Sequence, residues 1–354
     1  MIRLNRHTGH LRRAGSGPRS HPDLRSDPTH TGETELSLVP KIALEEHALC
    51  PSLTEYWHPT VADVPAVVRD RLLDALTDFG DRRIASMDRA GVETAVIGIA
   101  GPGVQVETDT KRAIAKAKAS NDFLAAEVAK KPGRYAGFGH MPMQDATAAA
   151  DELQRCVEEL KFCGAMINGQ TLGRYLDDPA YAPFWERAAA LKTWIYLHPA
   201  DPVATMPALE GTYGLKRATW EWGVETGTHA LRLVFGGVFD RYPDARLMLG
   251  HLGETLPYLL WRFDSRAQLY GVKLPQPPSF YIKRNIAVTT SGMSSAEPLN
   301  CALAALGNDR VCFASDHPFE DAGEAGHFLD GVALPEEVRR AVASANAKTL
   351  LGLA

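Results

Sequence analysis

The chain has 354 residues, of which 45% are hydrophobic and 23% are charged, and its formal net charge is −5 at pH 7. These proportions are typical of a globular protein with a large core, and the lack of a basic excess argues against nucleic acid as a partner. No apolar run reaches the roughly 18 residues of a transmembrane helix, so we expect no membrane partner. The five cysteines are scattered and form no CxxC pair, which indicates free thiols in a reducing compartment and predicts a cytoplasmic protein.

The N-terminal stretch differs in composition from the rest of the chain. Residues 1–22 contain five arginines and no acidic residue, and glycine, proline, serine and histidine are frequent up to residue 38. An arginine-rich, acid-poor segment is typical of a transit peptide, but the apolar face of an amphipathic helix is missing. We therefore predict a disordered tail over 1–38 and a single domain over 39–354.

From residue 41 onward, short runs of valine, isoleucine and leucine alternate with longer amphipathic stretches. This alternation predicts βα units and a parallel sheet. In chain order, the predicted strands are 41–45, 94–100, 135–141, 164–168, 194–198, 246–251, 285–291 and 311–316. The predicted helices are 67–90, 109–130, 145–161, 179–191, 221–240, 254–268, 296–306 and 335–350. Eight strands with intervening helices predict an α/β protein with a single (β/α)8 TIM-type barrel.

The rival architecture for this pattern is an open, doubly wound sheet. No GxGxxG motif follows the first predicted strand, and no P-loop pattern occurs in the chain. Nucleotide-binding versions of that fold therefore lose support.

In a (β/α)8 barrel, active-site residues lie at the carboxyl ends of the strands. Glu45 and His47 occur at the end of the first predicted strand, and their spacing of two directs both side chains to one face. His198 ends the fifth strand and Asp316 ends the eighth. Two histidines and two carboxylates predict a site for one divalent ion, Zn²⁺ or Mn²⁺. Alternatively, His47 contacts the substrate and three protein ligands hold the metal.

Two further candidates lie where the sixth strand passes into a helix. His251 ends the strand and Glu254 follows three residues later, so His251 is predicted to contact substrate or water while Glu254 orients it. The alternative is a buried histidine satisfied by a capping glutamate. Arg262 falls on nearly the same helix face and could bind an anionic substrate, or could be a surface arginine paired with an acid such as Asp264.

At these positions the sequence resembles the ACMSD-related branch of the amidohydrolase superfamily, and within it the nonoxidative aromatic-acid decarboxylases of the γ-resorcylate (2,6-dihydroxybenzoate) type. The segments that carry the resemblance are Ile42–His47, Arg83–Asp88, Gly101–Gln105, Tyr175–Pro179, Leu197–Pro199, Val224–Thr226, Leu249–Glu254, Trp261–Arg262, Thr290–Gly292 and Ser315–Glu320. They run in the same order over nearly the whole chain outside the tail.

The resemblance implies specific roles for the candidate residues. Glu45, His47, His198 and Asp316 would be metal ligands, and His251 with Glu254 would be catalytic. Asp316 would also carry the proton, and Arg262 would lie near the substrate. The resemblance further implies an ortho-hydroxylated benzoate as substrate, release of CO2 and a homo-oligomer.

Two positions test how far the resemblance extends. The decarboxylases for 2,3-dihydroxybenzoate and 5-carboxyvanillate carry alanine where His47 stands, so His47 favours the resorcylate type. In contrast, His317 and the loop 50–60 depart from that type, since its members have tryptophan or tyrosine at the first position and an apolar stretch at the second.

Two other functions remain open from the sequence. A metal-dependent amidohydrolase or lactonase could use the same barrel, with His251 and Asp316 acting on water. Against a two-metal hydrolase, the fourth predicted strand ends in Asn168 and offers no lysine or glutamate to bridge two ions. A binding protein that has lost the chemistry is the third possibility, although it would not need to retain every candidate ligand.

Overall fold

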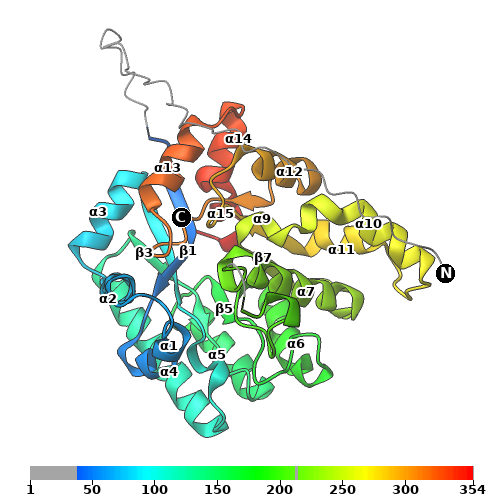
Figure 1. The fold of residues 1–354 in the computed structure, drawn as a ribbon, viewed down its shortest axis with the longest axis horizontal. Coiled ribbons are helices and arrows are strands. Elements are labelled where there is room, and N and C mark those ends of the chain that lie inside the picture. The colour runs from blue at the N-terminus through cyan, green and yellow to red at the C-terminus, as the bar shows by residue number, and fades with distance from the viewer. Residues whose placement is uncertain (1–37, 212–213, 354) are drawn as a thin grey trace, which may run out of the picture. The chain divides into compact units, whose positions relative to one another are not determined.

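The computed structural model describes residues 38–211 and 214–353, so residues 1–37 of the predicted tail lie outside the described residues. Its strands, in chain order, are β1 (Lys41–Ala48), β2 (Val92–Ile99), β3 (Tyr135–Gly137), β4 (Gly139–His140), β5 (Gly164–Asn168), β6 (Trp194–His198), β7 (Arg246–Leu249), β8 (Ile286–Thr289) and β9 (Val311–Cys312). All the paired neighbours run parallel, in the orders β1-β2-β3 and β4-β5-β6-β7-β8-β9. The strands occupy the centre of the fold, and helices surround them (Figure 1).

Backbone hydrogen bonds close this series of strands into a barrel. The N–H of Leu44 on β1 donates to the carbonyl of Phe313 at 3.1 Å, and the N–H of His47 donates to that of His317 at 2.8 Å. Between β3 and β4, the N–H of Phe138 donates to Ile97 of β2 at 2.9 Å. The predicted (β/α)8 barrel is therefore confirmed, with the third predicted strand divided at Phe138.

Glycines flank this division, and each has a side chain packed closely against it. A Cβ on Gly137 would lie 2.7 Å from the ring of Phe162, and one on Gly139 would lie 2.7 Å from the sulfur of Cys156. Both glycines therefore leave room for side chains from α5 and the segment after it.

The helices, in chain order, are η1 (Pro51–Leu53), α1 (Thr54–Thr60), α2 (Ala66–Leu76), α3 (Asp81–Ala90), η2 (Gly103–Val106), α4 (Thr110–Lys130), α5 (Ala146–Glu158), η3 (Pro179–Tyr181), α6 (Ala182–Leu191), η4 (Pro207–Leu209), η5 (Arg217–Thr219), α7 (Glu221–Phe235), α8 (Val238–Arg241), α9 (His251–Glu254), α10 (Leu256–Leu269), α11 (Pro278–Asn285), α12 (Ala296–Leu306), α13 (Ala322–Gly331), α14 (Glu336–Arg340), η6 (Ala341–Ala345) and α15 (Asn346–Leu351). The predicted helix 67–90 is wrong as one element, because α2 and α3 are separated by a turn in which Asp78 accepts the N–H groups of Gly80 and Arg83.

Helices α1, α11 and α13 were not predicted from the sequence. Proline at the first position suits the start of α11, but the preceding proline-rich segment reads as a loop. α13 contains several glycines, which lower helix propensity. A Cβ on Gly326 would lie 2.4 Å from the carbonyl oxygen of Ala90, so this glycine lets α13 pack directly on α3.

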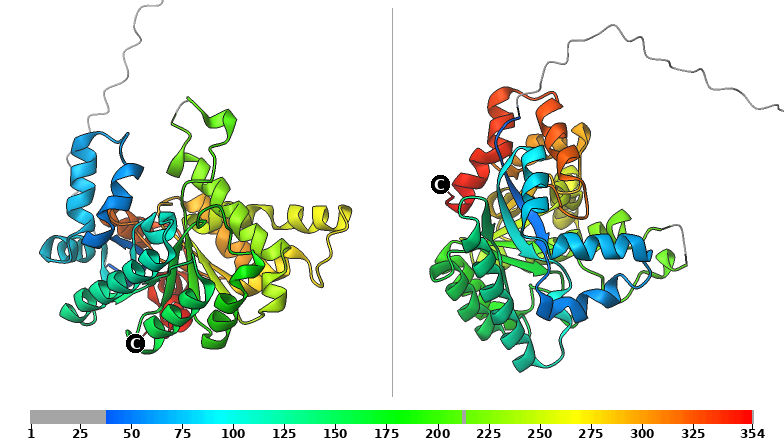
Figure 2. Two further views of the ribbon diagram at one scale, coloured as in Figure 1. Left: turned by 90° about the horizontal axis from the view of Figure 1, so that it is seen from below. Right: turned by 90° about the vertical axis from the view of Figure 1, so that its left-hand side faces the viewer.

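The two ends of the barrel are covered differently. At the amino end, the indole N–H of Trp194 donates to the carbonyl of Leu350 at 2.7 Å, which fixes α15 there. Helices α1 and α2 extend on the other side of the strands (Figure 2). β1 and β6 are the first and fifth strands of the eight-stranded barrel, and an ion pair of 2.9 Å between Asp63 and Arg217 joins the segments that follow them. Among the described residues, no helix is long and apolar enough to cross a membrane.

Candidate metal centre and active site

The four predicted metal ligands meet at the carboxyl end of the barrel. Glu45, His47, His198 and Asp316 each offer one ligand atom, and these atoms lie within 4.8 Å of one another. Oε1 of Glu45 is 3.5 Å from Nε2 of His198, and Nε2 of His47 is 3.1 Å from Oδ1 of Asp316. The structure thus brings together side chains from β1, β6 and the segment after β9.

A β-bulge in β1 directs Glu45 into the barrel. Ala43 pairs with Ala95 of β2 and Glu46 pairs with Ile97, so β1 advances by three residues where β2 advances by two. A bulge reverses the alternation of side chains locally, which lets Leu44 and Glu45 both contact the barrel interior. His47 follows two positions later on the same face as Glu45.

Several residues at the strand ends have left-handed backbone conformations. Asp316 has φ of 64° and His251 has φ of 51°, and Glu254 has φ of 52°. Such conformations cost about 1–3 kcal/mol for residues other than glycine and persist only where surrounding contacts hold them. Their concentration at these strand ends indicates that side-chain direction here is maintained against local backbone preference.

The donor atoms of the cluster fit a divalent cation. Oε1 of Glu45 is buried without a hydrogen-bond partner among the described residues, while Oε2 accepts a hydrogen bond from Tyr196. Burial is the largest cause that lowers the pKa of His47 and His198, each to about 4, which favours the neutral imidazoles that bind metals. Burial would raise the pKa of Glu45, but the neighbouring histidines outweigh it and lower that pKa.

A second group of residues adjoins the cluster. Nδ1 of His251 lies 2.6 Å from Oε1 of Glu254, and Nε2 of His251 lies 4.0 Å from Oδ2 of Asp316. Burial would lower the pKa of His251, but the carboxylates of Glu254 and Glu45 overcome it and raise the pKa to about 10. Burial, followed by the charge of Glu45, raises the pKa of Asp316 to about 7. A bound cation would lower both pKa values.

Arg262 is not brought to this group. Its side chain is exposed on α10, and no contact between it and the cluster occurs in the described parts of the chain. Two residues with a place in the site were missed from the sequence. Tyr196 lies two positions before His198 on β6, so strand alternation could have placed it on the same face. Phe319 has its ring centroid 5.3 Å from that of His47, but it lies in an irregular segment that gives no such signal.

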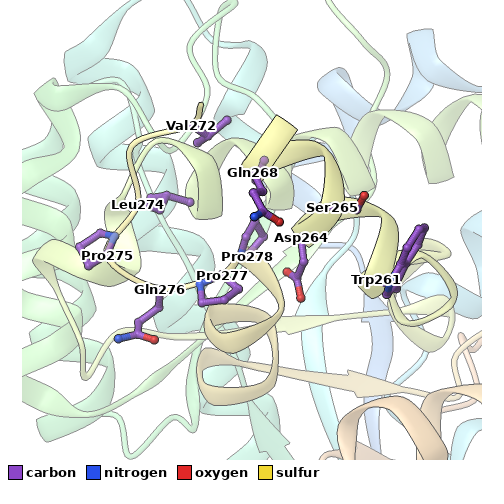
Figure 3. A pocket seen from close by; sticks show the side chains of 11 residues that line it. Trp261, Asp264, Ser265, Gln268, Val272, Leu274, Pro275, Gln276, Pro277 and Pro278 are labelled. Atoms are coloured by element: carbon purple, nitrogen blue, oxygen red, sulfur yellow. The ribbon is translucent and has the colours of Figure 1, made fainter. Parts of the chain in front are cut away.

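A separate cavity of about 500 Å³ lies beside α10 and shares no residue with the cluster (Figure 3). It is lined by residues 261–278, among them Trp261, Asp264, Gln268 and the run Pro275–Pro278. It contains neither histidine nor a pair of carboxylates, so it offers no catalytic constellation.

Together, the parallel barrel and the Glu/His/His/Asp cluster define a class of metal-binding barrel proteins. A family profile described as Amidohydrolase matches residues 52–353, and the chain belongs to that family. This confirms the resemblance drawn from the sequence motifs.

The relatives narrow the resemblance to aromatic-acid decarboxylases. The chain is 39% identical over 329 residues to gamma-resorcylate decarboxylase of Polaromonas sp. strain JS666, covering 88% of this chain and 98% of that enzyme. A 2,6-dihydroxybenzoate decarboxylase complexed with 2,6-dihydroxybenzoate is similar in structure, with a TM-score of 0.81, 37% identity and coverage of 89% of this chain and 99% of that one. The dihydroxybenzoic acid decarboxylase of Polaromonas sp. JS666, with bound manganese and the inhibitor 2-nitroresorcinol, gives a TM-score of 0.82, 38% identity and coverage of 89% and 97%.

Proposed function

We propose that this chain is a metal-dependent nonoxidative decarboxylase, a carboxy-lyase that removes CO2 from an ortho-hydroxylated benzoate such as 2,6-dihydroxybenzoate. The observation that carries the proposal is a buried cluster able to hold one ion in a chain whose similarity to a 2,6-dihydroxybenzoate decarboxylase extends over 89% of its length. The small aromatic acid is therefore the proposed partner of the site.

Glu45, His47, His198 and Asp316 would hold one divalent ion, Zn²⁺ or Mn²⁺. The unpartnered Oε1 of Glu45 supports this assignment. When bound, the ion supplies Lewis acidity that holds and orients an acidic substrate. If His47 contacts the substrate instead, three protein ligands remain, and the metal content of a His47→Ala variant separates the two arrangements.

The reaction requires a proton at the ring carbon that bears the carboxylate. Asp316 in its neutral form delivers that proton. The bond between this carbon and the carboxylate then breaks, its electron pair restores the aromatic ring, and CO2 leaves. The products are the ring with a hydrogen in place of the carboxylate, CO2 and the aspartate anion.

His251 and Glu254 would restore the proton to Asp316. The 4.0 Å between His251 and Asp316 permits transfer through a small approach or one water molecule. Glu254 fixes the orientation of the His251 ring. We propose that Arg262 attracts the anionic substrate. Its side chain is exposed on α10, so it must extend from that helix toward the bound substrate.

The test is a screen of hydroxybenzoates for CO2 release, with metal content measured on the same sample. We expect about one Zn²⁺ or Mn²⁺ per chain, loss of most of it in His198→Ala, and decarboxylation of 2,6-dihydroxybenzoate. A metal-loaded protein that decarboxylates no ortho-hydroxybenzoate but cleaves an ester, lactone or amide would instead be a hydrolase.

The proposal includes a homo-oligomer that forms through α10. Tyr258, Trp261 and Leu269 on this helix are exposed by 81%, 76% and 63%, and Tyr270 follows with 74%. Large apolar side chains gathered on one exposed element mark a protein interface, and aromatic residues are enriched at interface centres. The cavity beside Trp261 offers a recess for side chains of a second copy (Figure 3).

The proposal also covers the cell compartment and the domain. All five cysteines are free, which supports a reducing compartment such as the cytoplasm. The net charge of −5 supports function without nucleic acid. Residues 39–354 are proposed as a single barrel domain that functions without the tail 1–38.

A further inference from the structure

Glu46 lies between two metal-ligand candidates, but it does not join their cluster. Its side chain is 3% exposed and directed to Ser315, on the segment that carries Asp316. The backbone N–H of Ser315 donates to Oε1 of Glu46 at 2.9 Å, and the Ser315 hydroxyl donates to Oε2 at 2.7 Å. Both oxygens of this carboxylate are thus engaged by the residue that immediately precedes Asp316.

The contacts on either side of Ser315 extend this restraint. The hydroxyl of Thr290 donates to the carbonyl of Ala314 at 3.0 Å, and the N–H of Asp316 donates to the carbonyl of Glu45 at 3.1 Å. Three consecutive residues are therefore fixed from β1 and from the segment after β8. Since Asp316 has φ of 64°, its backbone adopts this conformation only because its neighbours impose it.

Stability alone gives no reason for a carboxylate at position 46. Burial of a charged group is costly unless a direct ion pair compensates it, and no ion pair of Glu46 occurs in the described parts of the chain. Arg83 is buried nearby, but its guanidinium donates to the carbonyl of His47 at 2.7 Å. An apolar side chain would fill this place without that cost, but it would release Ser315.

We infer that Glu46 is a positioning residue, which holds Ser315 so that the Asp316 carboxylate is directed at the metal cluster. The inference rests on the proposed function, because it gives Asp316 a part in metal binding and proton transfer. The two adjacent carboxylates therefore have different roles. Glu45 belongs to the metal cluster, and Glu46 fixes the segment that carries Asp316.

The test compares Glu46→Leu, Glu46→Gln and Ser315→Ala. Loss of a group that orients a ligand lowers metal affinity or activity by roughly 10–100-fold, so we expect Glu46→Leu and Ser315→Ala to weaken Mn²⁺ binding and to lower kcat by that order, with little change in KM. Glu46→Gln retains an acceptor for the Ser315 N–H, so its Mn²⁺ affinity and kcat should stay close to those of the wild type. Binding of Mn²⁺ is measured by titration calorimetry.

The matched control is Asp330→Asn, which removes another buried carboxylate tied to β1. Asp330 pairs with Lys41 at 2.8 Å, at the opposite end of the strand. We expect this variant to lower the melting temperature and to leave Mn²⁺ affinity unchanged. An equal loss of Mn²⁺ affinity in Asp330→Asn and Glu46→Leu at similar melting temperatures would overturn the inference, because it would indicate general loosening of β1.

The inference can also be tested if Glu46→Leu fails to fold or if the wild-type protein shows no decarboxylation. If Glu46→Leu does not fold, Ser315→Ala removes only one hydroxyl, and wild-type Mn²⁺ affinity and kcat in that variant would overturn the inference. Calorimetry requires no turnover. Suppose that the wild-type protein decarboxylates no hydroxybenzoate, but the Glu46→Leu and Ser315→Ala variants bind Mn²⁺ more weakly than the wild type does. That result would refute the proposed reaction and still support the positioning role of Glu46.

Discussion

The phenol of Tyr196 donates a hydrogen bond to Oε2 of Glu45, and the other oxygen of that carboxylate has no partner among the described residues. Thr289 on β8 lies 2.8 Å from the same phenol oxygen and fixes its direction. Gly250 leaves room for the carboxylate, since a Cβ there would lie 2.4 Å from Oε2. Glu45 is thereby held with one oxygen free for an ion.

Tyr196→Phe should therefore weaken Mn²⁺ binding about tenfold, because Glu45 loses the group that orients it. Titration calorimetry measures the change. Tyr281→Phe is the matched control, since it removes another tyrosine hydroxyl that bonds a carboxylate, at 3.1 Å from Asp240. Equal Mn²⁺ affinity in wild type and Tyr196→Phe would show that the phenol does not orient the ligand.

The Asp316→Asn variant distinguishes loss of the proton donor from loss of the whole metal site. An amide oxygen can still coordinate an ion, but an amide cannot serve as a carboxylic acid. We expect turnover of 2,6-dihydroxybenzoate to be nearly abolished while part of the metal and substrate binding survives.

Isotope labelling checks the same step in the wild-type protein. In D2O, deuterium should appear at the ring carbon that carried the carboxylate, as detected by NMR of the product. Substantial turnover by Asp316→Asn, or deuterium at a different carbon, would assign the proton to another group.

The residues of the cluster could be predicted because each lies near the carboxyl end of an apolar strand, and parallel strands of a barrel end at one face. That rule located Glu45, His47, His198 and Asp316 without any knowledge of their distances. It could not reveal the left-handed backbone of Asp316 or the partner of Glu46, since both depend on contacts between β1 and a segment about 270 residues away in sequence.

Two features that escaped prediction, α13 and the division of the third predicted strand, involve close packing against glycines. In α13, packing of Gly326 against α3 overrides the low helix propensity of its glycines. Gly137 and Gly139, on either side of Phe138, likewise leave room for Phe162 and Cys156. Local sequence contains propensity and periodicity, but neither records which neighbour fills the space beside a glycine.

Trp261→Arg should shift the proposed oligomer toward smaller species. The substitution places a charge among the exposed side chains of Tyr258, Leu269 and Tyr270, which form the proposed interface. Analytical ultracentrifugation measures the distribution. Val67→Arg, at a position of α2 that is 78% exposed, is the control and should leave the distribution unchanged. A wild-type protein that sediments as a monomer at assay concentrations would refute the α10 interface.

Deletion of residues 1–37 should leave both activity and the melting temperature close to those of the full chain. The reason is that β1, the first strand of the barrel, begins at Lys41 and is tied to α13 through Asp330. Differential scanning calorimetry and the decarboxylation assay check this. A large fall in melting temperature would show that the barrel requires the N-terminal segment.

His229 on α7 should make the fold sensitive to acid. Its side chain is 1% exposed, and its Nε2 accepts the N–H of Leu176 at 2.8 Å. Burial, with a smaller effect of Arg232, lowers the pKa of His229 from 6.5 to about 3. Between these values the unfolded chain binds the proton and the folded chain does not, so the free energy of unfolding falls as the pH drops from 6.5 toward 3.

The slope that one such group adds is at most about 1.4 kcal/mol per pH unit. His229→Gln retains an acceptor for Leu176 and does not titrate, so its free energy of unfolding should fall less steeply with acid than that of the wild type. Urea unfolding at several pH values between 6.5 and 4 measures both slopes. His327→Gln, at an exposed position of α13, is the control and should keep the wild-type slope. If His229→Gln also keeps it, then His229 is already protonated in the folded protein or is not buried as described.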